Sequence, residues 1–162
     1  FRSLNARADN DRYQEWNAEF NYGQAALRAP TVFNFFLPDF RPTGELSTLG
    51  LDAPEFQITN EIQTVGTANF FYELVKNEGY GSGDSRQKLN LTEAKALANN
   101  PAALIDHLSG LLTYGNLSEG TRQVMIDAVT SVPFNNRDSD RTWRVRTALT
   151  LFALSSDFVI QK

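Results

Sequence analysis

The sequence predicts an all-α protein, an irregular bundle of about five to six helices with a proline- and aromatic-rich extended segment. Several segments carry apolar residues at helical spacing, each behind a residue that favours a helix start. Alternating strand patterns and Asn-Gly hairpin signals do not occur in the sequence. Hydrophobic residues at 41% and charged residues at 21% are typical of a globular chain with a sizeable core. We therefore expect a single helical domain over residues 1–162.

Short elements are expected before residue 51. Residues 11–22 predict a short helix, because apolar residues recur there at helical spacing. The aromatic segment of residues 29–42 contains three prolines, and we expect a helical turn over residues 30–36 within it. A further turn is expected within residues 43–50. The apolar positions of the first helix are Tyr13, Trp16 and Phe20.

One long helix is expected next. It would begin at Pro54, which suits a first helical position, and end before Gly79. Residues 79–91 contain three glycines and predict a surface loop. The expected apolar stripe of the helix contains Ile58, Ile62, Val65, Tyr72 and Val75, widened by Phe56, Phe70, Phe71 and Leu74.

Four more helices complete the predicted bundle. Their expected caps are polar residues that accept hydrogen bonds from free backbone N–H groups. The second half of the last helix, residues 147–154, is apolar on nearly every side and is expected at the centre of the core. Residues 157–162 are expected to be extended. The four helices cover residues 92–99 with a cap at Thr92, 101–113 with a cap at Asn100, 118–132 with a cap at Ser118, and 139–155 with a cap in the Asp–Ser–Asp run of Asp138, Ser139 and Asp140.

The composition predicts neither a metal site nor a bound cofactor. Cysteine is absent, and His107 is the single histidine, which we interpret as a residue on a helix surface. The glycine patterns that cradle phosphates or dinucleotides are absent too. A net charge of −4 argues against nucleic acid as a partner, and no stretch is long enough to span a membrane. Arg141, Arg144 and Arg146 are expected on a solvated helix face with local ion pairs.

Five polar side chains among the aromatic residues are candidate binding residues: Asn34, Asp39, Glu55, Gln57 and Asn60. Such groups are costly to bury without partners. They could lock the proline-rich segment onto the start of the long helix, which is the interpretation we favour. Alternatively, they could line a polar pocket for a sugar or a peptide, with aromatic rings as stacking walls.

Several separated motifs resemble the C-terminal part of the bacterial family catalogued as "domain of unknown function 1800". The resemblance covers most of the chain from about Gly23 onward, and it is weak over residues 79–98. The motifs are APTVFNFFLPDF at residues 29–40, GEL at 44–46, APEFQI at 53–58, LSEGTR at 117–122 and RVRTALTLFALSSDFVIQK at 144–162.

The resemblance implies a C-terminal fragment of a large, helix-rich, exported bacterial protein, and therefore a periplasmic or extracellular location. The signal peptide of such a protein would lie outside these residues. Members of the family are often encoded beside an exported family that resembles sulfatases and alkaline phosphatases, which makes such a protein a possible partner. No catalytic residues are implied by the resemblance.

Two functions follow from these observations. The absence of a metal-ligand cluster, a nucleophile motif and a cofactor loop favours a non-catalytic binding or assembly module. The alternative is an enzyme domain, such as a glycan-directed hydrolase, that uses a carboxylate pair drawn from Asp39, Glu55 and Glu61.

Overall fold

The computed structural model describes residues 2–12, 18–19 and 23–159, without the side chain of Val159. The described residues are mostly helical, and the longer helices form a bundle, which confirms the predicted fold class. The helix predicted over residues 11–22 falls largely outside the described part. The α-helices are α2 (Glu45–Thr48), α3 (Glu61–Lys76), α4 (Thr92–Ala96), α5 (Pro101–Leu112), α6 (Glu119–Ser131), α7 (Asp138–Leu154) and α8 (Ser156–Val159). The described part of the chain also contains three 3₁₀ turns and two short strands. The turns are η1 (Arg2–Leu4), η2 (Pro54–Gln57) and η3 (Gly83–Ser85), and the strands are β1 (Gly79–Tyr80) and β2 (Gln87–Lys88).

The chain divides into two compact units, which we call the helical unit and the loop unit. The helical unit contains Phe1–Gln14 and Phe71–Lys162, and the loop unit contains Glu15–Phe70. Helix α3 belongs to both, since the boundary falls after Phe70. The single domain predicted over residues 1–162 stays a prediction.

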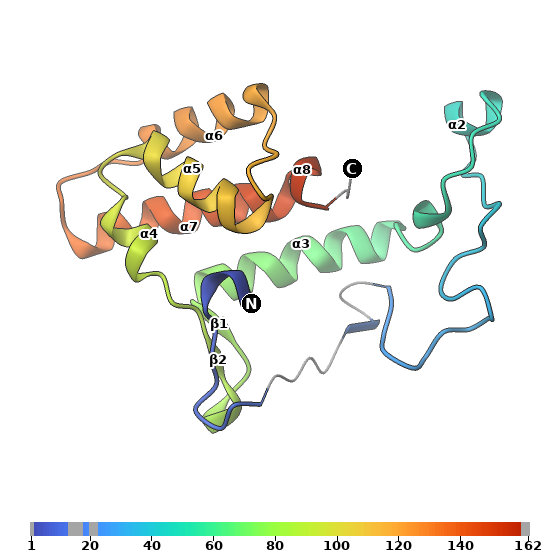
Figure 1. Cartoon of the computed structure of the whole chain (residues 1–162), viewed down its shortest axis with the longest axis horizontal. Helices are drawn as coiled ribbons and strands as arrows, with labels where there is room; N and C mark the ends of the chain where they lie inside the picture. The colour runs from blue at the N-terminus through green and yellow to red at the C-terminus, as the bar shows by residue number, and fades with distance from the viewer. Residues whose placement is uncertain (1, 13–17, 20–22, 160–162) are drawn as a thin grey trace. The chain divides into compact units, whose positions relative to one another are not determined.

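Helix α7 is the centre of the helical unit. It contacts α4, α5, α6 and α8, and Figure 1 shows it running along α5 and α6. The segment of residues 147–154 lies in the core, as predicted, although Leu154 itself is exposed. The fully buried large side chains of the unit are Leu104, Ile105, Leu108, Val129, Val145 and Phe152.

Polar caps set the helix starts in this unit. The side chains of Asn100 and Ser118 accept hydrogen bonds from the backbone of Ala103 and Thr121, which confirms both predicted caps. At α4 the prediction was wrong, because the Asn90 side chain accepts from the Thr92 N–H and Thr92 is the first helical residue.

Helix α7 begins at Asp138, one residue before the predicted start. Within the predicted Asp–Ser–Asp cap, the Asp140 carboxylate accepts the N–H groups of Asn135 and Arg137, at 2.8 and 3.2 Å. These backbone hydrogen bonds hold the pKa of Asp140 below its ordinary value.

A small antiparallel hairpin replaces the loop predicted over residues 79–91. Gly79 pairs with Lys88, and a Cβ atom at Gly79 would overlap the Gln87 carbonyl oxygen. Arg7 extends the pairing, since its N–H donates to the Lys88 carbonyl at 3.1 Å and its carbonyl accepts the Lys88 N–H at 2.9 Å. One of the three glycines that suggested a loop, Gly79, therefore permits close approach of the two backbones. The expected extended tail is also wrong at its start, where α8 forms.

The loop unit has short elements joined by turns. Residues 31–34 form a turn rather than the predicted helical turn, because Asn34 adopts a left-handed backbone with φ of 72°. Residues 41–52 form a loop that carries α2, which confirms the turn predicted within 43–50. An ion pair between Arg41 and Asp52 and a hydrogen bond from the Ala53 N–H to the Phe40 carbonyl at 2.9 Å close this loop at its base.

The long helix predicted from Pro54 is interrupted. Residues Pro54–Gln57 form η2, and α3 begins only at Glu61. The Asn60 side chain accepts the Gln63 N–H at 2.9 Å, so that Asn60 caps a new helix start. The expected apolar stripe is also wrong in its first half: Ile62 and Val65 are exposed, whereas Phe70, Leu74 and Val75 are buried.

Candidate functional site

A polar pocket of about 270 Å³ lies within the loop unit. Side-chain amides and one acid–base pair supply its polar groups, and Phe35, Pro30 and Ile58 supply apolar wall. The full lining is Glu19, Gly23, Arg28, Pro30, Phe35, Gln57, Ile58, Asn60 and Gln63.

The amides of this pocket are used to hold the unit together. The Gln57 Oε1 atom accepts the Leu37 N–H at 2.7 Å, which ties the aromatic segment to η2. The Gln63 Nε2 atom donates to the Glu19 carbonyl at 3.4 Å. Together with the cap made by Asn60, these hydrogen bonds connect three stretches that lie far apart in the sequence. Each amide that lines the pocket therefore has a structural use.

The charged part of the pocket is the ion pair between Arg28 and Glu19, whose nearest atoms are 3.1 Å apart. Their side chains are 70% and 65% exposed, so water screens the pair and it adds little stability. Gly23 also lines the pocket and has a left-handed conformation, where a Cβ atom would come within 2.9 Å of the Gln63 side chain. A larger residue at this position would push against Gln63.

The structure brings two of the five candidate residues into this pocket. Gln57 and Asn60 line it, whereas Asn34, Asp39 and Glu55 are absent from its lining. Asn34 and Asp39 are exposed, and the backbone N–H of Asn34 closes its own turn on the Thr31 carbonyl. Their binding role stays a prediction.

Glu55 is also exposed, on η2. Its backbone carbonyl accepts the Ile58 N–H at 3.3 Å and the Thr59 hydroxyl at 3.0 Å. The hydrogen bonds by which Glu55 stabilises this turn are therefore made by its backbone carbonyl.

Sequence reasoning missed Glu19, Arg28 and Gln63 as pocket residues. A signal for Gln63 existed, because Asn60 and Gln63 have the spacing of a helix cap followed by a polar N3 residue. No sequence pattern identified Glu19 and Arg28. The two residues are nine positions apart, and they meet because the chain turns between them.

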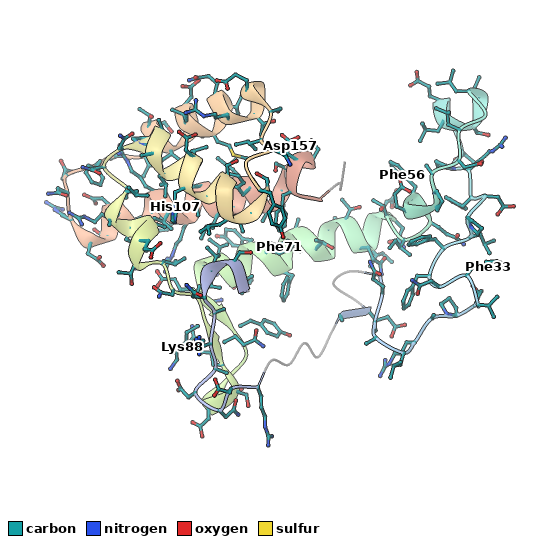
Figure 2. The ribbon with its side chains drawn as sticks, viewed as in Figure 1. Phe33, Phe56, Phe71, Lys88, His107 and Asp157 are labelled. Carbon is teal, nitrogen blue, oxygen red and sulfur yellow. The ribbon has the colours of Figure 1, made fainter. Side chains whose placement is uncertain are left out.

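Exposed apolar side chains are the second feature of the loop unit. Among the described residues, nine of the fourteen exposed large hydrophobic side chains belong to this unit. Of the twenty buried hydrophobic residues, alanines included, only Ala53 and Phe70 belong to it. Val32 is 95% exposed and Phe33 56% exposed. Figure 2 labels Phe33 and Phe56, which lie on different segments of the unit. We call the nine the exposed apolar set: Leu27, Val32, Phe33, Leu37, Leu49, Leu51, Phe56, Ile62 and Val65.

The two units also differ in charge. Residues 15–70 contain seven acidic and two basic side chains and have a formal charge of −5, whereas the remaining residues have a formal charge of +1. Arg28 and Arg41, the two basic residues, are paired with Glu19 and Asp52. The loop unit is therefore both apolar and anionic on its exposed side chains.

Polar clusters of the helical unit have clear structural partners. Glu78 binds Lys95 and Arg146, at 3.4 and 3.2 Å, and all three side chains are mostly covered. The Asp157 carboxylate accepts the N–H and hydroxyl of Ser118, at 3.2 and 3.0 Å. In the part of the chain that the structure describes, no group of three or more His, Cys, Asp or Glu side chains could hold a metal ion.

The prediction that the arginines of α7 lie on a solvated face is wrong for Arg144 and Arg146. Arg144 is buried, and Arg146 reaches Glu78 across a long sequence distance. His107 is only partly exposed, with its Nε2 atom 3.9 Å from Glu93. No helix within the described ranges has the length and apolar character to cross a membrane.

Comparison with known proteins finds no matching family model, no matching curated protein and no matching solved structure.

Proposed function

We propose that the chain is a non-catalytic binding or assembly module, in which the helical unit is the scaffold and the loop unit makes the contact. The observation that carries this proposal is the exposed apolar set. Burying a Val, Leu or Phe side chain contributes about 1.5–3 kcal/mol relative to leaving it in water. A contact that covers several members of the set would gain stability that the unit does not obtain from its own core.

The hydrogen bonds of the loop unit support the same proposal. Gln57, Asn60 and the Arg41–Asp52 pair hold the backbone of the aromatic segment and of the 41–52 loop. A segment that is held in place before binding loses less conformational entropy on binding. We therefore assign the pocket amides to a structural lock, and the contact itself to the apolar side chains that the lock presents.

We also propose the partner and the location that the sequence motifs suggest. Membership of the family of "domain of unknown function 1800" would place the chain in an exported bacterial protein, in the periplasm or outside the cell. The test partner is then the sulfatase-like exported protein encoded beside it. The motif of residues 29–40 supports this choice, because it contains Val32 and Phe33.

Direct binding to that partner tests the function. Biolayer interferometry would compare the unchanged chain with the double variant Val32→Ser/Phe33→Ser. We expect the double variant to weaken binding at least about tenfold, a change of about 1.4 kcal/mol. The matched control is Val124→Ser, an exposed position on α6 of the helical unit, which should bind as the unchanged chain does. Equal binding by the double variant, or a comparable loss in the control, contradicts the proposal.

The hydrolase alternative has no structural observation in its favour. Asp39, Glu55 and Glu61 are exposed, and none of the three lines the described pocket. The one carboxylate in that lining, Glu19, is paired with Arg28. The alternative stays a prediction.

A further inference from the structure

We infer that the loop unit docks on a protein face that is both apolar and basic, and that this face is not the loop unit of a second copy of the chain. This inference rests on the proposed function. It adds the chemistry of the partner, which the exposed apolar set alone does not define.

The charges of the loop unit carry the inference. Both of its basic side chains are used internally, because Arg28 pairs with Glu19 at 3.1 Å and Arg41 pairs with Asp52. Among the residues that the structure describes, four further carboxylates of the unit are exposed and form no recorded ion pair. They are Asp39, Glu45, Glu55 and Glu61. The unit therefore offers anionic groups without cations to balance them.

Several exposed carboxylates of the loop unit lie next to exposed apolar side chains in the sequence. Glu55 is followed by the exposed Phe56, and Glu61 by the exposed Ile62. Asp39 follows Leu37 by two residues. A partner that covers the apolar side chains must therefore come close to these carboxylates. Leaving the carboxylates desolvated and unpaired is costly, whereas lysine or arginine side chains at the rim would satisfy them.

The sign of the charge argues against a second loop unit, nucleic acid and anionic membranes as occupants. Two copies of the loop unit would bring formal charges of −5 together, and such like charges repel at close range. Nucleic acid and anionic membrane surfaces are disfavoured for the same reason. A basic and apolar protein face is the occupant that both the charge and the hydrophobicity fit.

Two matched synthetic probes test the chemistry of the partner. One is an amphipathic peptide of leucine and lysine, and the other has glutamate in place of every lysine. Fluorescence anisotropy would measure binding of each peptide to the full chain at low salt and at about 0.15 M salt. We expect the leucine–lysine peptide to bind at least about tenfold more tightly, and its advantage to shrink as salt rises.

Two sets of substitutions that replace carboxylates by amides test which unit causes the preference for the basic peptide. The triple variant Asp39→Asn/Glu45→Gln/Glu55→Gln should remove most of the preference for the basic peptide. A matched triple variant of the helical unit, with the changes Asp84→Asn, Glu93→Gln and Asp138→Asn, removes the same number of negative charges and should keep the preference. Equal loss in both variants would show that net charge alone attracts the peptide, and would overturn the inference.

The remaining outcomes separate this inference from the proposed function. If both peptides bind equally and Val32→Ser/Phe33→Ser weakens both, the basic partner is wrong and the apolar contact stands. If neither peptide binds, the inference fails, and the proposed function is then decided by the partner-binding experiment with Val32→Ser/Phe33→Ser. A dimer in sedimentation experiments that Val32→Ser/Phe33→Ser abolishes would identify a second copy as the occupant. Binding to phosphatidylcholine vesicles instead of either peptide would identify a lipid surface.

Discussion

Arg144 is the residue that joins the helices of the helical unit. Its guanidinium donates to the Ala98 carbonyl at 3.0 Å and to the Val132 carbonyl through two nitrogens, at 3.2 and 3.1 Å. Both carbonyls lie just beyond helix ends, at α4 and α6, where backbone acceptors lack partners within the helix. The Phe134 ring covers the guanidinium, with its centroid 4.4 Å away.

Replacing Arg144 should therefore destabilise the protein. We expect Arg144→Ala to lower the free energy of unfolding by about 2–3 kcal/mol, because it leaves one buried carbonyl and one partly buried carbonyl without this donor. Arg144→Lys should recover little, since an ammonium group does not have the fork that reaches both carbonyls. Arg141→Ala is the control and should change stability by at most about 0.5 kcal/mol. Denaturant unfolding measures all three, and a loss no larger for Arg144→Ala than for Arg141→Ala would refute the role.

The ion pair of Asp106 with Arg122 makes the stability of the helical unit depend on pH. The Arg122 guanidinium donates to both oxygens of its carboxylate, at 2.7 and 2.9 Å, and holds the pKa of Asp106 below its ordinary value of 3.8. A lowered pKa in the folded state means that the pair stabilises the fold above the ordinary pKa. The contribution disappears as the pH falls through the lowered pKa.

The variant Asp106→Asn tests this effect. Unfolding free energies of the unchanged chain and of the variant should differ at about pH 6, and the difference should shrink below about pH 4. A difference that does not change with pH would mean that the pair acts through packing or geometry instead of charge.

At the scale of elements, the interrupted start of α3 shows how side chains decide where a helix begins. Apolar spacing alone predicts one helix from Pro54, since Phe56, Ile58 and Ile62 fit a helical pattern. Asn60 competes with that helix, because its side chain can replace a backbone acceptor for the Gln63 N–H. The turn at residues 58–60 then lets Gln57 reach Leu37.

Hydrogen exchange at Leu37 measures the lock directly. Gln57→Ala removes the acceptor of the Leu37 N–H, so we expect exchange of that amide to become faster. Because the bond is exposed, the loss of global stability should be only about 0.5–1.5 kcal/mol. Gln123→Ala, which removes an amide on α6 that contacts Asp127, should leave exchange at Leu37 unchanged. Unchanged exchange in Gln57→Ala would show that the lock does not hold the segment.

The two faces of α7 should respond differently to truncation. Phe152 is fully buried and Leu154 is exposed, although they are two residues apart on the same helix. We expect Phe152→Ala to cost about 3–5 kcal/mol, and Leu154→Ala at most about 0.5 kcal/mol. Thermal or denaturant unfolding would measure both, and similar losses would mean that the helix is not packed on one face as described.

At the scale of the whole molecule, the sequence predicted the helical unit far better than the loop unit. In α5 and α6, apolar spacing and an adjacent cap agree, so Asn100 and Ser118 identify the helix starts. In the loop unit, the arrangement depends on contacts between residues that are distant in sequence, such as Gln57 with Leu37. A pattern along the chain does not encode which distant backbone amide a side chain will meet.

The candidate site follows the same rule. Gln57 and Asn60 could be selected because amides beside aromatic residues are unusual in a short stretch. Glu19 and Arg28 could not, since their pairing results from turns rather than from spacing. The sequence also did not predict that Val32 and Phe33 are exposed, because aromatic and apolar residues ordinarily predict burial.

We propose that the apolar side chains of the loop unit serve binding rather than folding. The most direct test is the free energy of unfolding of the double variant Val32→Ser/Phe33→Ser. Side chains that are already in water lose no packing when they are replaced, so we predict a change of at most about 0.5 kcal/mol. A loss of about 2–5 kcal/mol, as expected for core residues, would show that these side chains belong to the folded interior, and it would contradict the claim.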